Sequence, residues 1–204
     1  MTVRVAVIGG GEHARVVIET ARSVHLAIEG FLDPRPCEDT QQRLGVPWLG
    51  DDAVRDDLAY VLGVGGAGID NVRARLVDRY ATATFVAIVH ANAWVSPTAR
   101  VHAGAVVLAG AVIQSGAEIG PHAIVGSGAV IEHDVVLGAF VQAAPGVVIG
   151  GGAHIGDGSY LGIRACVRDH VTIGARTLVG MGAVVTSGVD AGLVVMGVPA
   201  RVRT

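Results

Sequence analysis

The chain has few aromatic residues, two cysteines, no run of basic residues and no long uninterrupted apolar segment. Aromatic residues make up 4% of its 204 residues, although hydrophobic residues make up 51%. Cores of this size normally contain more Phe, Tyr and Trp, so we expect a thin interior filled by small aliphatic side chains. The net charge of −3 and the lack of a Lys/Arg run argue against nucleic acid or an anionic membrane as the main partner.

The two cysteines, Cys37 and Cys166, lie in different halves of the chain and fit neither a disulfide framework nor a zinc-binding spacing. We therefore expect two reduced thiols in a cytoplasmic protein. A strand-like segment, 3–8, follows the first residues directly and leaves no room for a signal peptide. Gly, His and charged residues interrupt the apolar stretches every few positions, so no segment is expected to span a membrane.

A six-residue repeat dominates the C-terminal half of the chain. Steps of six from residue 95 to residue 185 meet an apolar residue every time, with a small or β-branched residue two positions earlier and often Gly one position later. One buried aliphatic and one buried small residue per hexad suit a short strand followed by a tight corner, and three hexads close a triangular coil. An amphipathic helix needs a period of 3.6 and tolerates this density of Gly and Val poorly. The pattern therefore predicts a parallel β-helix over residues 90–204. The repeated apolar positions are Val95, Val101, Val107, Ile113, Ile119, Val125, Ile131, Leu137, Ala143, Ile149, Ile155, Leu161, Val167, Ile173, Val179 and Val185.

Residues 1–89 lack this repeat and alternate between strand-like and helix-like segments. This order predicts a short Rossmann-like βαβ domain with a parallel sheet. The first helix should bury an apolar face formed by Ala14, Val17, Ile18 and Ala21. The predicted strands are 3–8, 28–32, 58–64 and 85–89, and the predicted helices are 12–22 and 71–80.

The turn after the first predicted strand matches the G-x-G-x-x-G/A fingerprint of phosphate-binding turns, from Gly9 and Gly11 to Ala14. Glycines let the backbone approach a phosphate, and the helix that follows offers free N–H groups. Asp33, at the end of the second strand, occupies the place where such folds put a carboxylate for a ribose or a base. The alternative is a tight turn that binds nothing.

An NAD-dependent oxidoreductase is the competing enzyme class for this turn. Fewer than ninety residues leave too few strands for two mononucleotide-binding halves. Glu12 also brings a negative charge close to the proposed phosphates. We therefore expect phosphate binding but not dinucleotide binding.

An ordered set of motifs resembles a known family along essentially the whole chain. A Gly-Gly-x-His-Ala-Arg turn at residues 10–15 precedes the hexads, and Ile-Val-His at 88–90 leads into Val-Ser-Pro at 95–97. The segments 130–134, 161–167 and 197–200 complete the set. This arrangement resembles the sialic acid O-acetyltransferase-like sugar acyltransferases, and within them the bacterial nucleotide-amino-sugar N-acetyltransferases of the bacillosamine and perosamine type.

The resemblance implies a left-handed β-helix, a homotrimer and active sites in the clefts between neighbouring β-helices. Acetyl-CoA would lie against the later coils as co-substrate, no metal would be needed, and the N-terminal domain would present a nucleotide-linked sugar. The residues implied for acetyl-CoA binding are Gln142, Gly151, Gly162, Cys166, His170 and Pro199. Those implied for nucleotide-sugar binding are Gly9, Gly10, Gly11, Glu12, His13, Ala14, Arg15, Asp33 and Gly65.

The hexad frame selects His133 as the general base, because it lies two places past the inward Ile131 and so points outward at a corner. One coil is eighteen residues, which places Gly151 beside His133 on the same edge. His133 would accept a proton from the attacking amine, and Asp134 or a nearby carboxylate would orient its ring. Gly151 is the candidate N–H donor for the thioester oxyanion.

One position departs from the family pattern, which usually carries a second His nine residues after the base. Here that position is Gln142, which forms hydrogen bonds but takes up no proton. His133 is then the expected base, and the length of the acyl chain stays open. His170 lies on the same edge two coils from Asp134 and is a rival base, although CoA contact or trimer packing suits it better. For Cys166, an inert thiol is the alternative.

The sequence leaves two further alternatives open and argues against a third. A sialic acid-type O-acetyltransferase keeps the fold and changes the acceptor to a hydroxyl. A β-solenoid scaffold or nucleotide sensor would not bind acetyl-CoA. A zinc-dependent or carbonic anhydrase-like site lacks a His-x4-His pair. The nucleotide base stays open between UDP, GDP and dTDP, as do the sugar and the acetylated position.

Overall fold

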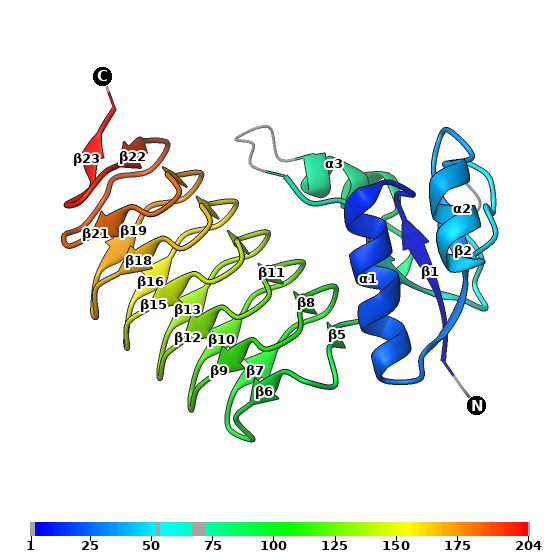
Figure 1. The fold of residues 1–204 in the computed structure, drawn as a ribbon, viewed down its shortest axis with the longest axis horizontal. Helices are drawn as coiled ribbons and strands as arrows, with labels where there is room; N and C mark the ends of the chain where they lie inside the picture. The colour runs from blue at the N-terminus through cyan, green and yellow to red at the C-terminus, as the bar shows by residue number, and fades with distance from the viewer. Residues whose placement is uncertain (1–2, 52–53, 67–71, 204) are drawn as a thin grey trace.

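The computed structural model describes residues 3–51, 54–66 and 72–203 of the chain. A small α/β domain lies against one end of an elongated β-solenoid, and the C-terminus lies at the far end (Figure 1). The helices of the α/β domain are α1 (Glu12–Ser23), α2 (Glu38–Leu44) and α3 (Val72–Arg79), and its strands are β1 (Arg4–Ile8), β2 (Ala27–Leu32), β3 (Ala59–Leu62) and β4 (Thr84–Phe85). No helix of the described residues is long and apolar enough to cross a membrane.

The four strands of the α/β domain form a parallel sheet in the order β2-β1-β3-β4. The central strand β1 is apolar on both faces because helices cover both. Val5 and Val7 pack with α1 on one face, while Ala6 and Ile8 pack with the α3 side on the other. The predicted βαβ domain is confirmed.

The α1 helix buries the four residues expected from its periodicity, together with Thr20. The α2 helix was missed, because its polar sequence buries Thr40 alone and so shows no apolar period. Gly45 ends α2 in a left-handed conformation (φ 60°), and this glycine was the available signal. The predicted helix 71–80 is α3, and residue 71 lies outside the described residues.

The predicted strand 85–89 is two short strands, because the chain changes sheets within it. Thr84 and Phe85 pair with β3 in the α/β sheet, whereas Ile88 and Val89 form β5 and pair with β8 (Val106–Val107) of the solenoid. The two units also share a core, since Ile88 and Val106 pack with the α1 side of the α/β domain.

The solenoid has three parallel sheets, which we number as faces in chain order. Up to β21, partners on each face lie eighteen residues apart, as in Val130 with Val148, so three hexads make one coil as predicted. The last coil is shorter, since Leu178 pairs with Val194. The first face contains β5 (Ile88–Val89), β8 (Val106–Val107), β11 (Ile124–Val125), β14 (Gln142–Ala143), β17 (Tyr160–Leu161), β20 (Leu178–Val179), β22 (Val194–Met196) and β23 (Arg201–Val202). The second contains β6 (Trp94–Val95), β9 (Val112–Ile113), β12 (Val130–Ile131), β15 (Val148–Ile149), β18 (Cys166–Val167) and β21 (Val184–Val185). The third contains β7 (Arg100–Val101), β10 (Glu118–Ile119), β13 (Val136–Leu137), β16 (His154–Ile155) and β19 (Thr172–Ile173).

Almost all of the repeated apolar side chains lie in the solenoid core, together with the small residues two positions before them. Val95 and Val101, in the first coil, are partly buried and pack against that core. The coils end at β22 and β23, which pair antiparallel, unlike the other described strand pairs.

From Gly104 to Gly182, each corner contains two turn residues, and the second has a left-handed backbone. This position has a φ between 53° and 73° at every sixth residue from Gly104 to Gly182. Glycine adopts it without strain, whereas other residues need a local reason to occupy it. The other residues there are His122, Asp134, Phe140, Arg164, His170 and Arg176.

One of these residues, His122, is buried where the two units meet. Its ring stacks on Phe140 with centroids 5.1 Å apart and meets the edge of Phe85 at 4.7 Å. Burial, followed by the charge of Arg73, lowers the pKa of His122 below its ordinary 6.5. The folded protein therefore resists protonation of this ring.

We expect His122 to make the protein less stable in acid. Below pH 6.5 the unfolded chain binds a proton on His122 that the fold rejects, so the free energy of unfolding falls as the pH falls. Replacing His122 by Phe, a residue that Phe140 shows to fit this backbone conformation, should flatten the fall in melting temperature between about pH 7.5 and 5.5. The exposed His154→Gln serves as control, and equal pH slopes in wild type and His122→Phe would contradict the expectation.

Candidate functional site

The corner between the second and third faces carries the predicted catalytic residues, and the solenoid register stacks them. The Gly152 N–H donates to the His133 carbonyl at 2.8 Å, and the His170 N–H donates to the Gly151 carbonyl at 2.9 Å. His133 and Gly151 are therefore first turn residues of adjacent coils, while Asp134 is a second turn residue. The structure brings these three residues together as the eighteen-residue spacing predicts.

His133 and Asp134 form an exposed pair at this corner. Their side chains are 57% and 73% exposed, and His133 Nδ1 lies 3.0 Å from Asp134 Oδ2. A carboxylate accepts hydrogen bonds, so this contact assigns the proton to Nδ1 and leaves the Nε2 lone pair free. The pair can therefore take up a proton at Nε2, as a base oriented by a carboxylate does.

The ring of His133 lies directly over Gly151, which is buried beneath it. A Cβ added to Gly151 would lie 2.5 Å from His133 Nε2 and 2.6 Å from Cε1. Gly151 is not among the positive-φ residues, so the need for glycine is one of space rather than backbone conformation. Its N–H has no hydrogen-bond partner among the described residues.

His170, a second turn residue of the next coil, lies on the other side of the same Gly151-Gly152 turn. A Cβ added to Gly152 would lie 2.5 Å from His170 Nδ1. His170 is exposed and lies on the same edge as His133, as predicted.

The other residues expected to contact acetyl-CoA lie on other parts of the solenoid. Gln142 is on the first face, where its Oε1 accepts the Gly66 N–H at 3.0 Å. Gly162 is at the corner between the first and second faces, and Cys166 is partly exposed on the second face. Pro199 follows a cis peptide bond near the C-terminus. Within one chain, these residues do not form a single site with His133.

The residues expected to bind a nucleotide sugar gather at the carboxyl end of the α/β sheet. The turn after β1 and the loop after β3 lie on either side of the point where the strand order reverses, which is where α/β sheets bind ligands. Gly9 has a φ of 105° and lies against Val64 of the opposite loop. The Gly10 N–H donates to Asp33 Oδ2 at 2.9 Å, so the carboxylate holds the turn in place.

The residues of the motif that follow the glycines lie in the first turn of α1. Glu12 is exposed in the first turn of α1, and Ala14 is buried against Gly63. Arg15 forms an ion pair with Asp39 of α2. His13 lies beside Gly65, where an added Cβ would lie 3.1 Å from its ring, and its buried Nε2 has no partner among the described residues. Burial and the charge of Arg73 lower the pKa of His13.

A cavity of about 130 Å³ opens at this edge of the sheet. Apolar side chains form most of its wall, and polar groups come from Asp33, Asp51 and Arg79. Asp51 and Arg79 were not predicted as site residues, because no motif marks either of them as part of a binding site. The lining residues are Ile8, Gly9, Leu32, Asp33, Pro34, Asp51, Val64, Leu76, Arg79 and Tyr80.

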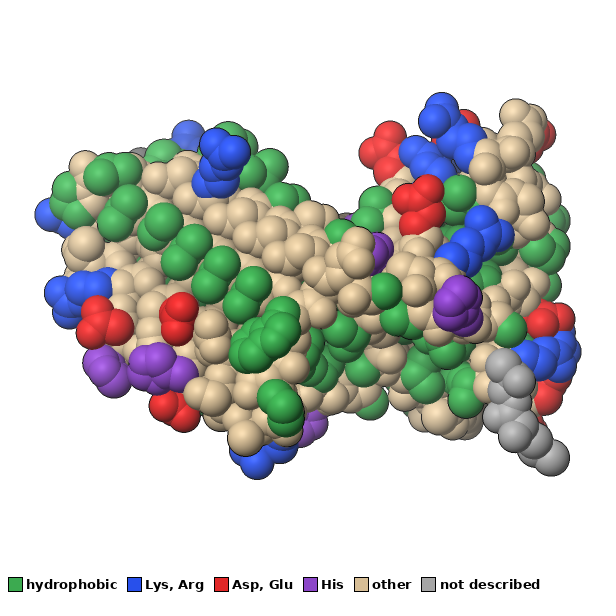
Figure 2. Space-filling view, turned by 60° about the horizontal axis from the view of Figure 1, so that its bottom comes forward, with side chains coloured by type: hydrophobic (Ala, Val, Ile, Leu, Met, Phe, Trp, Pro, Cys, Tyr) green, Lys and Arg blue, Asp and Glu red, His purple; other side chains and the backbone are tan. Residues whose placement is uncertain are grey.

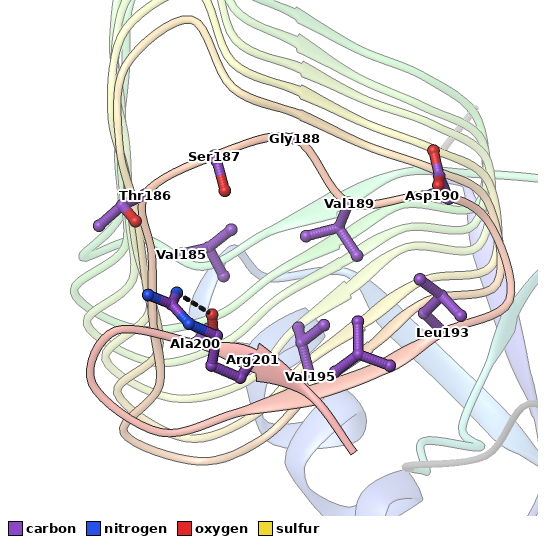
Figure 3. A pocket seen from close by; sticks show the side chains of 11 residues that line it. Val185, Thr186, Ser187, Gly188, Val189, Asp190, Leu193, Val195, Ala200 and Arg201 are labelled. Atoms are coloured by element: carbon purple, nitrogen blue, oxygen red, sulfur yellow. Dashed lines mark hydrogen bonds between the residues drawn. The ribbon is translucent and has the colours of Figure 1, made fainter. Parts of the chain in front are cut away.

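A second cavity, of about 220 Å³, lies at the C-terminal end of the solenoid (Figure 3). Val185, Val189 and Val195 point into it because no further complete coil covers the core, and Arg201 on β23 borders it. This cavity is the end of the solenoid interior. Among the residues that the structure describes, no group of three or more His, Cys, Asp or Glu side chains could hold a metal ion.

Comparisons with known proteins identify both units of the chain. Residues 98–133 and 152–187 match the bacterial transferase hexapeptide model (six repeats), and residues 4–80 match the PglD N-terminal domain. No curated protein sequence gives a significant match.

Solved structures match over nearly the whole chain. PerB from Caulobacter crescentus, in complex with CoA and GDP-perosamine, is 35% identical, with a TM-score of 0.88 over 98% of this chain and 97% of that one. A variant of GDP-perosamine N-acetyltransferase from the same organism matches equally well, covering 98% and 96%. The acetyltransferase domain of PglB from Neisseria gonorrhoeae, in complex with acetyl coenzyme A, is 32% identical, with a TM-score of 0.89 over 100% of both chains. The chain therefore belongs to the hexapeptide-repeat nucleotide-amino-sugar acetyltransferases that carry a PglD-type N-terminal domain.

Proposed function

We propose that this protein transfers the acetyl group of acetyl-CoA to the amino group of a nucleotide-linked amino sugar. The observation that supports this most strongly is the His133–Asp134 pair over Gly151, in a chain that matches GDP-perosamine N-acetyltransferase along its length. Residues 1–89 bind the nucleotide sugar through the glycine turn and the 63–66 loop. Residues 90–204 bind acetyl-CoA and carry out the transfer, and neither task needs a metal.

The transfer is direct. The amine nitrogen attacks the thioester carbonyl, and His133 Nε2 removes a proton from that nitrogen as the new C–N bond forms. Asp134 stabilises the resulting imidazolium through Nδ1. The Gly151 N–H donates to the oxygen that becomes negative in the tetrahedral intermediate. When the C–S bond breaks, the proton on His133 passes to the thiolate of CoA, so the products are an amide and free CoA.

The assembly that we propose is a homotrimer packed through the second face of the solenoid. A row of hydrophobic side chains runs along this face (Figure 2), from Trp94, which is 51% exposed, to Val148, which is 40% exposed. The corresponding row on the third face contains Arg100, Glu118 and His154. A continuous apolar surface of this kind marks a protein contact.

Packing through the second face would place the His133 corner at the edge of the contact, in a cleft between two subunits. Acetyl-CoA would then reach His133 of one subunit together with residues such as Cys166 and His170 that lie along the cleft. The number three rests on the family resemblance. We place the protein in the cytoplasm, where nucleotide sugars and acetyl-CoA are made and used.

The proposed reaction is tested by acetyl-CoA consumption with amino sugars linked to GDP, UDP and dTDP. We expect amide product from a 4-amino sugar, and His133→Asn should lower kcat by about 10² to 10⁴-fold because general-base catalysis contributes that much. Asp134→Asn, which keeps a residue that tolerates left-handed backbone, should lower kcat without changing stability. Products from hydroxyl acceptors alone would establish the O-acetyltransferase instead, and a lack of acetyl-CoA binding in calorimetry would establish the scaffold.

Replacing Gly151 by Ala should displace the base without removing it. The new methyl group would occupy the space of His133 Nε2, and a displacement of about 1 Å in a reacting group costs about 10²-fold in rate. We expect kcat to fall accordingly while the melting temperature changes little. Gly188→Ala is the control, because an added Cβ there would lie 3.7 Å from the Thr172 carbonyl oxygen, an ordinary van der Waals distance. Unchanged turnover in Gly151→Ala would contradict the assigned position of the base.

Replacing Val148 by Arg should dissociate the trimer, because a charge would then face the apolar row of the neighbouring subunit. Light scattering should show monomers, and turnover should fall at least about tenfold because each cleft needs two subunits. Thr172→Arg, on the polar third face, should leave the trimer intact. A trimeric Val148→Arg would rule out the second face as the contact.

A further inference from the structure

A single buried cation lies between the two units of the chain among the residues that the structure describes. Arg73, the second residue of α3, is 8% exposed, and its guanidinium reaches from the α/β domain to the solenoid. Nη1 donates to the His122 carbonyl at 3.0 Å, and Nη2 donates to the Phe140 carbonyl. The two carbonyls are eighteen residues apart, so one side chain bridges adjacent coils at the same corner.

The backbone hydrogen bonds between coils do not involve these two carbonyls. His122 and Phe140 are second turn residues at the corner between the third and first faces, and the backbone hydrogen bonds of that corner use the carbonyls of first turn residues, such as Pro121 and Ala139. Arg73 is therefore the described hydrogen-bond partner of both groups. Its planar fork of donors suits two acceptors held at a fixed spacing.

No described carboxylate pairs with Arg73. Burial lowers its pKa to about 10, so the guanidinium stays charged at neutral pH. Placing a charge in a protein interior is costly, and the two hydrogen bonds to the His122 and Phe140 carbonyls offset that cost. The charge is therefore held between the two units by directional hydrogen bonds to two adjacent coils.

The contacts around Arg73 connect it to the proposed nucleotide site. The Gly66 N–H donates to Gln142 on the same coil as Phe140, which fixes the end of the 63–66 loop. That loop supports the ring of His13, since Gly65 lies against it. Gln142 thus holds the loop on the solenoid, and Arg73 holds α3 on the same coils, where its charge acts on the ring of His13. The loop forms one side of the proposed nucleotide site.

We propose that Arg73 is a positioning residue, which fixes the nucleotide-binding domain on the solenoid so that the bound amino sugar reaches the acetyl group. This inference rests on the proposed acetyltransferase activity. Arg73 does not contact the reacting atoms, and it acts by fixing α3 on the solenoid beside the His13 side of the nucleotide site. A nucleotide sugar must span both units, whereas acetyl-CoA binds to the solenoid alone.

The proposal predicts that Arg73→Met weakens the productive binding of the nucleotide sugar but not the binding of acetyl-CoA. We expect the KM for the nucleotide sugar to rise about tenfold and kcat to fall up to about 10²-fold, since misplacement of a bound reactant affects both, while the Kd for acetyl-CoA stays within about twofold. Hydrogen exchange of the Gly66 amide should accelerate, because its acceptor lies across the contact. Arg22→Met is the matched control, since exposed Arg22 also donates to a carbonyl but within the α/β domain.

Arg73→Lys separates position from charge, and it keeps the test valid if Arg73→Met does not fold. A lysine keeps the positive charge but lacks the fork that bridges two carbonyls, so we expect the same losses as in Arg73→Met. Wild-type kinetics in Arg73→Lys, or unchanged Gly66 exchange in Arg73→Met, would overturn the proposal. Failure of the wild-type protein to acetylate any nucleotide sugar would instead refute the proposed function, and Gly66 exchange would still report on the role of Arg73.

Discussion

The eighteen-residue register of the solenoid is the constraint on which the rest of the structure depends. Parallel hydrogen bonds between coils place each residue above the one eighteen positions earlier, so chemistry at one corner is assembled from neighbouring coils. His133 and its orienting Asp134 come from one coil, and Gly151 comes from the next. A short local sequence therefore creates a site without a long loop, and the aliphatic core beneath makes its geometry rigid.

In the proposed function, the α/β domain supplies a binding edge for the nucleotide sugar at the carboxyl end of its sheet. Its contact with the solenoid combines an apolar part, in which Ile88 and Val106 share a core with α1, and a polar part formed by Arg73 and Gln142. The apolar part supplies adhesion, whereas the directional hydrogen bonds specify one orientation. Gln142 stands where the family pattern usually has a histidine. Its side chain accepts a hydrogen bond from the 63–66 loop and does not face the His133 corner.

The sequence predicted what depends on periodicity and left out what depends on contacts between distant segments. The hexads predicted the coils, the inward residues and the stacking of His133 with Gly151, since a constant register turns sequence distance into spatial distance. The α2 helix was missed because it buries so little, and Arg73 was missed because a buried arginine in a polar helix looks like a solvated one. The same limit applies to Asp51 and Arg79, which only the folded sheet brings to the cavity.

The antiparallel pairing of β22 and β23 has a consequence for the solubility of the molecule. A stack of parallel coils exposes unpaired backbone at its last coil, and such an edge can act as a template for another chain. The last strand of the first face, β23, runs antiparallel to the coils. A further coil could therefore not continue the parallel pairing of this face directly. At the opposite end, the α/β domain packs beside β5 and obstructs the approach to the first coil. Neither end of this face therefore presents the edge of a further parallel coil.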